Sequence, residues 1–351
     1  MLCPHCNQNL LYKERSWKKC SKCGRKFAFE PKTDALGLHD QRFRKAVAKL
    51  GADGKLYFTC GQLQYFLSRK KLKNSFNRVR QLLFFIMFAA LAATIFLIVT
   101  LSSFILFSAT FLIFAVFVVL LLISWKREGD LSLPQSNQTF EGDVLGRWRE
   151  VYQQLPATFL TNHKLPAQHL VSARGALVCS EPEVLACLSA NGTTENLGLL
   201  LLNARNPEKT SLEFVQNRSD LPIFVLHDAS IEGCLLRENF VCAHLADNQN
   251  RKVYDIGLRP KTALKAKLPQ LRRKTTESLP GSSNLTAEEI NWLDKGNYTP
   301  LLALTPARLV KLVTRSVNQG FQLAAKPSLK SPETKDQRAA QAVGFMTWFD
   351  Q

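Results

Sequence analysis

The chain has 351 residues, a length typical of two to three domains, and its composition is ordinary for a folded protein. Its net charge of +18 is concentrated near the N-terminus, where residues 1–81 carry 19 Lys and Arg against 5 Asp and Glu. Such a basic block suits anionic lipid headgroups or nucleic acid, and charge alone does not distinguish the two. The opening residues lack the apolar core of a signal peptide, so we do not expect secretion.

Two C-x2-C pairs open the chain, with 13 residues between them: Cys3, Cys6, Cys20 and Cys23. Two such knuckles bring four thiolates together around a tetrahedral Zn²⁺. In this spacing residues 2–30 resemble the zinc-ribbon family. Four thiolates close the coordination shell, so we predict a structural zinc without an open catalytic position. The ribbon is expected to act as an adaptor for a protein partner or a nucleic acid.

Residues 31–81 are predicted to form a small basic helical spacer. One amphipathic helix is expected at 39–51, and a second begins at a capping box formed by Thr59 and Gln62. A helix–wing–helix arrangement that binds DNA is the alternative. The spacer is favoured because no recognition helix stands out.

Residues 82–124 contain no charged side chain, and their length matches two membrane-spanning helices with a turn near residues 100–103. The alternative is a buried helical core wrapped by protein. Basic residues flank both ends of the stretch, so the positive-inside rule places both termini in the cytosol. We therefore predict an integral membrane protein, as in a bacterial inner membrane, whose two-helix hairpin and basic flanks contact membrane lipid.

After a linker at 125–143, residues 144–274 are predicted to form an α/β domain. Four apolar runs separated by helical patterns are expected to be parallel, covered strands: 175–180, 197–203, 221–228 and 251–258. Right-handed crossovers then place Glu181, Asn203 and Asp228 at one edge of the sheet. Open α/β sheets bind their ligands at that edge.

This arrangement resembles the Toprim domain of topoisomerases and primases over about residues 172–260. That family has a glutamate after the first strand and D-x-D-x-x-G after the third. Glu181 and the stretch from Asp228 to Gly233 occupy the matching positions. The resemblance implies that Glu181 acts as an acid or base and that Asp228 holds Mg²⁺ near a phosphodiester.

Ser230 stands where the Toprim family has its second aspartate. A hydroxyl is a poorer Mg²⁺ ligand than a carboxylate, so Glu232 or Glu183 would have to compensate beside Ser230. The alternative assigns no chemistry to these residues. In that interpretation Asp228 or Ser230 caps the third helix, and Glu181 is a first-turn acid favoured by the helix dipole.

Residues 275–324 are predicted to be a helical extension that begins at a capping box of Thr286 and Glu289, and 325–351 a partly disordered tail. The remaining five cysteines are interpreted as reduced and buried: Cys60, Cys179, Cys187, Cys234 and Cys242. The predicted fold class is a multi-domain membrane protein with a zinc ribbon, a transmembrane hairpin and a C-terminal α/β domain with a mainly parallel sheet.

Two functions remain open from the sequence. The first is a membrane-anchored cytosolic binding or scaffold protein without catalytic activity, which the missing second aspartate favours. The second is a Mg²⁺-dependent enzyme of nucleic acids or phosphoesters that uses Glu181 and Asp228. Structural zinc is expected in both, and Mg²⁺ only in the second.

Overall fold

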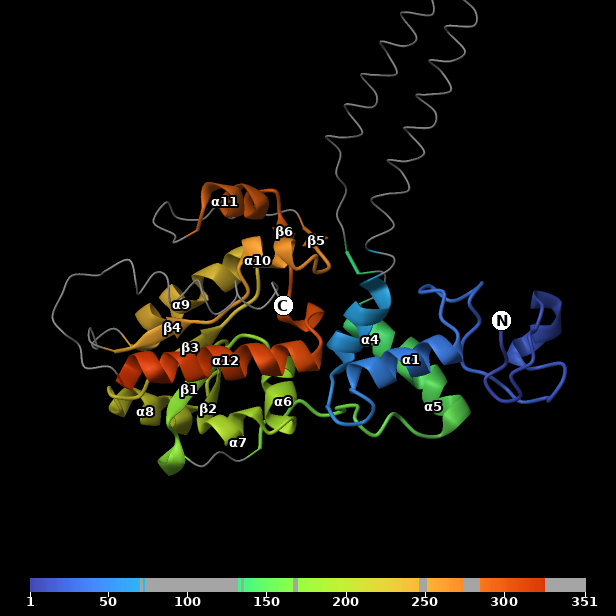
Figure 1. The fold of residues 1–351 in the computed structure, drawn as a ribbon, viewed down its shortest axis with the longest axis horizontal. Helices are drawn as coiled ribbons and strands as arrows, with labels where there is room; N and C mark the ends of the chain where they lie inside the picture. The colour runs from blue at the N-terminus through green and yellow to red at the C-terminus, as the bar shows by residue number, and fades with distance from the viewer. Residues whose placement is uncertain are drawn as a thin grey trace, which may run out of the picture. The chain divides into compact units, whose positions relative to one another are not determined.

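A computed structural model describes residues 1–69, 72, 132–133, 136–166, 170–245, 251–273 and 285–325 (Figure 1). The chain divides into two compact units, one formed by Met1–Ser68 with Leu133–Gln351 and the other by Arg69–Ser132. The second unit lies almost wholly outside the described residues. The architecture below is that of the first unit.

The transmembrane hairpin predicted at 82–124 lies outside the described residues. Within the described part of the chain, no helix is both long enough and apolar enough to cross a membrane. The 20-residue α12 (Pro306–Ala325) has the length, but it is amphipathic, with polar and basic side chains such as Lys311 and Arg315 opposite its buried apolar residues. The predicted membrane-protein fold class and integral-membrane localisation are corrected on this finding. The structure supports an α/β chain with an N-terminal four-cysteine cluster and a parallel sheet.

The N-terminal helical part is built from segments that precede and follow residues 69–132 in the sequence. Its elements are α1 (Asp40–Leu50), a helix at residues 60–69, α4 (Asn137–Phe140), the short π-helical η2 (Glu141–Leu145) and α5 (Gly146–Tyr152). They share one core, in which the rings of Phe43 and Trp148 lie 4.4 Å apart. Thr59 and Gln62 form the predicted capping box, since the Thr59 N–H donates to Gln62 Oε1 at 3.1 Å.

Four parallel strands form the central sheet, in the order β2-β1-β3-β4. They are β1 (Gly175–Cys179), β2 (Leu199–Asn203), β3 (Ile223–Leu226) and β4 (Val253–Asp255). Cys179 pairs with Asn203 on one side and Leu226 on the other, so all three strands end at the same edge. The predicted parallel sheet and the shared edge of Glu181, Asn203 and Asp228 are confirmed.

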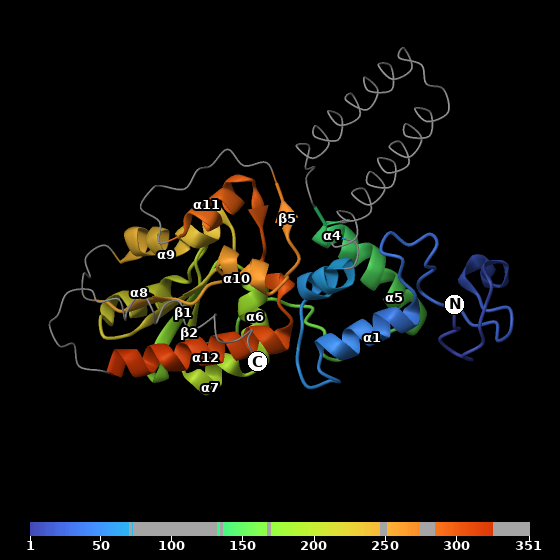
Figure 2. The ribbon, with the colours of Figure 1, turned by 45° about the horizontal axis from the view of Figure 1, so that its top comes forward.

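Helices cover both faces of this sheet (Figures 1 and 2). They are α6 (Pro182–Ala190), α7 (Thr193–Leu197), α8 (Lys209–Asn217), α9 (Ile231–His244), α10 (Pro260–Lys265) and α12. On one face Val215 of α8 and Phe240 of α9 pack on alternate strand residues such as Val178. On the other face Phe224 of β3 meets Phe321 of α12 edge to face, 5.3 Å apart, and α12 packs on α6 and α7.

The C-terminal extension folds back over the edge of the sheet. Its elements are β5 (Leu271–Arg272), α11 (Ala287–Asp294), β6 (Asn297–Tyr298) and η4 (Leu301–Ala303), while η3 (Leu170–Ser172) precedes β1. Strands β5 and β6 are antiparallel. The capping box of Thr286 and Glu289 at the start of α11 is confirmed. Ala229 and Thr299 exchange backbone hydrogen bonds of 3.0 and 3.1 Å, which place the extension against the end of β3.

Candidate functional site

The four ribbon cysteines form a cluster of ligand atoms. The Sγ atoms of Cys3, Cys6, Cys20 and Cys23 all lie within 4.8 Å of one another. Cys3 and Cys23 are 3.8 Å apart, as are Cys6 and Cys20. A tetrahedron of sulfurs around zinc, with Zn–S bonds of about 2.3 Å, has edges of about 3.8 Å. The spacing therefore fits Zn²⁺ and is far too long for disulfides, whose sulfurs lie about 2 Å apart.

The ribbon consists of two hairpin knuckles, and their likeness extends beyond the two predicted C-x2-C pairs. An antiparallel bridge joins Leu2 to Asn9 in the first, and another joins Lys19 to Lys26 in the second. Each knuckle closes on a residue with positive φ directly after its second cysteine: Asn7 at 56° and Gly24 at 70°. Between the knuckles lies the 3-10 segment η1 (Tyr12–Lys18). Asn tolerates this conformation better than most residues, so Asn7 can take the place that glycine has in the second knuckle.

Backbone amides in the second knuckle stabilise the thiolate form of Cys20. The N–H groups of Lys22 and Cys23 donate to Cys20 Sγ, each at 3.4 Å. Burial opposes ionisation of Cys20, but these amides outweigh it and bring the pKa of its thiol down to about 7. The thiolate is the metal-binding form, whereas the pKa of the neighbouring Cys6 thiol is raised to about 11, so the spacing of the four sulfurs is what indicates Zn²⁺ binding here. Four thiolates would hold the ion, and it would replace the missing hydrophobic core of residues 1–27.

The second predicted site lies at the edge where the parallel strands end. Glu181 follows β1 by two residues, and Asp228 follows β3 by two residues. Burial raises the pKa of both carboxyl groups, and each is raised further by neighbouring carboxylates, which for Glu181 include that of Asp228. The fold therefore gathers the two acids, in agreement with the predicted edge.

Ser230 is the cap of α9. Its hydroxyl oxygen accepts the N–H of Gly233 at 2.9 Å, and its O–H donates to Asp228 Oδ1 at 2.6 Å. A Cβ atom on Gly233 would lie 2.1 Å from that same oxygen. The Asp–x–Ser–x–x–Gly spacing thus has a local physical cause. Glycine leaves room for the buried carboxylate against the first turn, and serine links the carboxylate to the helix.

The other acids of this edge have partners of their own. Glu181 lies 3.7 Å from Arg205, and Glu232 lies 3.0 Å from Arg273. Glu183 Oε2 accepts the N–H of Gly61 at 3.0 Å, at the start of the helix at residues 60–69. The sequence-predicted candidates therefore share one edge, but each acid is compensated by a cation or a hydrogen-bond donor.

The edge offers no second metal cluster. Across the residues that the structure describes, the four ribbon cysteines are the only group of three or more His, Cys, Asp or Glu side chains close enough to hold a metal ion. Glu181, Asp228 and Glu232 are accordingly neighbours without a common set of ligand atoms. Ser230 uses its hydroxyl in the cap.

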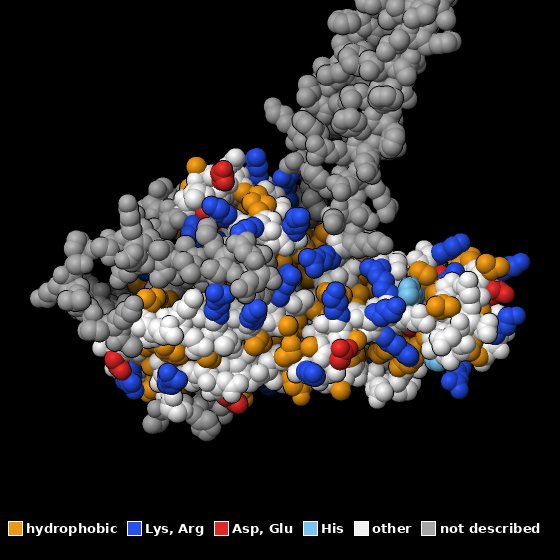
Figure 3. Space-filling view, viewed as in Figure 1, with side chains coloured by type: hydrophobic (Ala, Val, Ile, Leu, Met, Phe, Trp, Pro, Cys, Tyr) orange, Lys and Arg blue, Asp and Glu red, His pale blue; other side chains and the backbone are white. Residues whose placement is uncertain are grey.

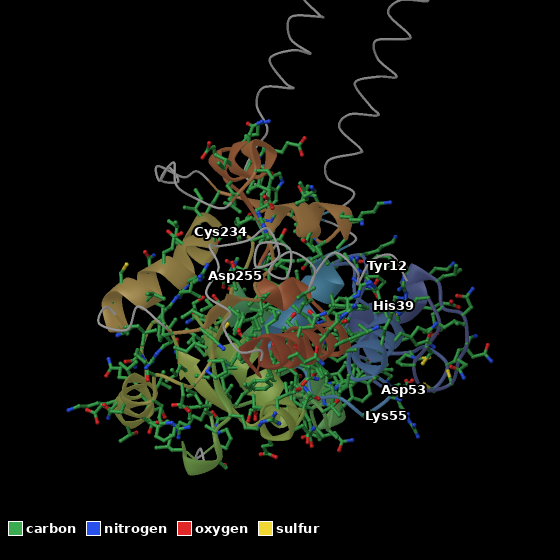
Figure 4. The ribbon with its side chains drawn as sticks, turned by 60° about the vertical axis from the view of Figure 1, so that its left-hand side comes forward. Tyr12, His39, Asp53, Lys55, Cys234 and Asp255 are labelled. Carbon is green, nitrogen blue, oxygen red and sulfur yellow. The ribbon has the colours of Figure 1, made fainter. Side chains whose placement is uncertain are left out.

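A buried histidine–aspartate pair beside Asp228 was missed by sequence reasoning. His227 is 1% exposed, its Nε2 lies 2.9 Å from Asp255 Oδ1, and its Nδ1 lies 2.7 Å from the Asp228 carbonyl oxygen. Burial opposes charge on both partners, but their attraction raises the pKa of His227 and lowers that of Asp255 to about 2. Figure 4 shows Asp255 at the end of β4 near Cys234 of α9. The only signal in the sequence was Asp255 itself, an acid within the strand predicted at 251–258.

The cysteines outside the ribbon only partly follow the prediction. All carry free thiols, and three are buried as expected: Cys60, Cys179 and Cys187. Cys234 is partly buried, and the prediction was wrong for Cys242, which is exposed. Helix α9 turns that side chain to solvent, which an apolar sequence neighbourhood does not reveal.

Comparison with known proteins identifies no family. No model of a protein family matches the chain, and no curated protein is significantly similar to it. The four-stranded parallel sheet is shown, and the resemblance to the Toprim domain stays a prediction from Glu181, Asp228 and Gly233.

Proposed function

We propose that this chain is a binding or scaffold protein, with a structural zinc ribbon and a Toprim-like α/β module that lacks catalytic activity. The observation that carries the proposal is that the Ser230 hydroxyl caps α9 and bonds to Asp228. A Mg²⁺ site at this edge needs a second hard, charged oxygen near Asp228. The residue at that position is a neutral hydroxyl whose two hydrogen bonds are both committed, one to Gly233 and one to Asp228.

The compensated charges around this edge support the same conclusion. Arg205 and Arg273 form exposed ion pairs with Glu181 and Glu232, and burial raises the pKa of the Glu181 and Asp228 carboxyl groups. A metal ion would have to displace these partners before it gained carboxylate ligands. The energetic gain of binding would be reduced by the contacts that are lost.

The partner-binding surface is assigned to the ribbon. A zinc with four thiolate ligands has no open position for chemistry, so its contribution is to hold a surface in a fixed shape. The excess of Lys and Arg near the N-terminus is suited to an anionic partner. A protein partner with acidic side chains and a nucleic acid both meet this description.

A Mg²⁺-dependent nuclease or phosphoesterase is the second candidate. It is favoured by one observation, the position of Glu181 and Asp228 at the ends of neighbouring parallel strands. Open α/β sheets bind ligands at this kind of edge. In that mechanism Glu181 would move a proton and Asp228 would bind the metal.

Calorimetric titration of Mg²⁺ and Mn²⁺ into the full chain separates the two candidates. Asp228→Ala is the test variant, and Asp294→Ala, which removes an exposed acid at the end of α11, is the matched control. We expect the wild type and both variants to give the same weak heats of titration without saturation. We expect none of them to hydrolyse labelled DNA, RNA or a small phosphodiester. Saturable binding that only Asp228→Ala abolishes, together with metal-dependent hydrolysis, would replace the binding function with the enzymatic one.

A further inference from the structure

The ribbon presents an indole ring to solvent. Trp17 is 91% exposed, the highest value among the exposed large apolar side chains of the described residues. Within the same part of the chain, no aromatic ring or cation packs on it. A tryptophan in this state offers most of its apolar surface, and its ring N–H, to a partner.

Trp17 lies in a left-handed turn of the backbone. Trp17 and Lys18 both adopt left-handed conformations, with φ of 58° and 53°. This conformation costs energy in residues other than glycine, and it persists only where the surroundings enforce it. The N–H of Lys19 donates to the Ser16 carbonyl at 3.1 Å and closes the turn immediately before the second knuckle. Trp17 therefore lies in a tight backbone turn directly before the second knuckle.

The ribbon carries more free cations than acids on its surface. Six cationic side chains in residues 1–32 are exposed: Lys13, Lys19, Lys22, Arg25, Lys26 and Lys32. The two acids of this segment are otherwise engaged. Glu14 is half-buried and accepts the N–H of Leu11 at 2.7 Å, while the buried Glu30 pairs with Arg15 at 3.1 Å. Lys and Arg are accordingly spread over the ribbon and α1 on the face drawn in Figure 3.

A second ring lies on the same ribbon. Tyr12 is 50% exposed, and the Nζ atom of Lys32 lies 4.1 Å from the centre of its ring (Figure 4). This cation–π contact fixes the ring and places a positive charge directly beside it. The ribbon thus combines flat aromatic faces with cations at close range.

We propose that this aromatic–cationic surface, defined as Trp17, Tyr12 and the six exposed cations, binds single-stranded nucleic acid. The indole stacks on an unpaired base, and the cations follow the phosphates. Duplex bases do not offer free faces for such stacking, and the buried centres of protein interfaces are poor in lysine. The proposal specifies the partner of the binding function proposed above and rests on it.

The test is fluorescence anisotropy of a labelled oligothymidine about 15 nucleotides long, a length in the range such sites cover, titrated with the zinc-loaded full chain. Three substitutions separate stacking from apolar contact: Trp17→Ala, Trp17→Leu and Trp17→Phe. Tyr57→Ala, which removes an exposed aromatic outside the ribbon, is the matched control. Zinc content is measured for every variant, so that a damaged ribbon is recognised.

We expect Trp17→Ala and Trp17→Leu to weaken binding roughly 5- to 100-fold, and Trp17→Phe and Tyr57→Ala to remain near wild type. Lys22→Ala with Lys26→Ala should instead reduce the slope of log affinity against log salt by about 0.7 for each cation removed. Affinity for a duplex of equal length should be lower than for the single strand.

Wild-type affinity in Trp17→Leu would overturn the stacking proposal, as would binding to phosphatidylserine vesicles without binding to the oligonucleotide. Either result leaves the metal titrations of Asp228→Ala unchanged. Conversely, Mg²⁺-dependent hydrolysis would overturn the non-catalytic function and leave the behaviour of the ribbon variants intact. The two proposals can therefore fail separately.

Discussion

Substitution of Gly233 by alanine tests how Asp228 is held at the edge of the sheet. A Cβ atom at this position would lie 2.1 Å from Asp228 Oδ1 and 2.4 Å from the Asp228 carbonyl oxygen, where ordinary contacts lie at 3.4–4 Å. The side chain could rotate away, but the backbone carbonyl cannot. The loop after β3 or the first turn of α9 must therefore move by about 1 Å, an overpacking strain of the kind that core insertions produce.

Two opposing energies decide the size of the effect. Alanine favours helical backbone over glycine by up to about 1 kcal/mol. Overpacking costs about 1–3 kcal/mol, and displacement of the Gly233 N–H from Ser230 removes a helix cap worth about 1 kcal/mol. The clash and the lost cap outweigh helix propensity, so we expect Gly233→Ala to destabilise the α/β part by about 1–3 kcal/mol.

Urea unfolding of the full chain, together with hydrogen–deuterium exchange of peptides from β3 and α9, measures this change. Gly146→Ala is the matched control, because Gly146 lies in α5 and nothing surrounds its Cβ position within 4 Å. This control should gain up to about 1 kcal/mol. The reasoning is refuted if Gly233→Ala is as stable as the wild type, or if exchange in its β3 and α9 peptides does not become faster.

Three further predictions concern the metal cluster, the histidine–aspartate pair and the helix cap. Metal analysis should find one zinc ion per wild-type chain and none in Cys20→Ser, whose ribbon should become a site of rapid proteolysis because the metal is expected to replace its core. An intact, protease-resistant ribbon in the variant would contradict this. Asp255 has its pKa lowered to about 2 by His227, so its contribution to stability is complete above its unfolded pKa near 4 and is lost as pH falls through about 2. Asp255→Asn should cost about 1–3 kcal/mol at neutral pH. It should also remove the loss of stability that urea unfolding shows for the wild type between about pH 4 and pH 2. The same loss of stability in the variant would exclude the pair as its source. Ser230→Ala should destabilise α9 by about 0.5–2 kcal/mol in the same assay, and no loss would show that the cap is dispensable.

The sheet was predictable because its strands are buried on both faces. Continuous apolar runs such as Ala176–Cys179 are typical of parallel strands covered by helices. The same burial led to an error in the predicted start of the second strand, which was placed at residue 197. Leu197 is also buried, but it ends the extra helix α7, and Gly198 with φ of 65° separates it from β2. An apolar run alone does not distinguish the end of a buried helix from the start of a buried strand.

The candidate site was predictable only where it follows strand ends. Glu181 and Asp228 could be placed at one edge because chain order and crossover handedness fix that edge. Their partners could not be placed, because Arg205 and Arg273 approach from loops and from the C-terminal extension. No periodicity relates Arg273 to Glu232, which are 41 residues apart. The exposed Trp17 was likewise hidden, since only the left-handed turn determines that its ring faces solvent.

The core that joins α1 to α5 has a consequence for the order of events during synthesis. Phe43 and Trp148 pack directly on one another, although about a hundred residues separate them. At about 5–20 residues per second, the ribosome needs about 5–20 s to reach Trp148 after Phe43. During that interval the apolar side of α1 lacks the helix that completes its packing. Chaperone capture of nascent chains is therefore expected to peak between these two positions and to end once α5 has emerged.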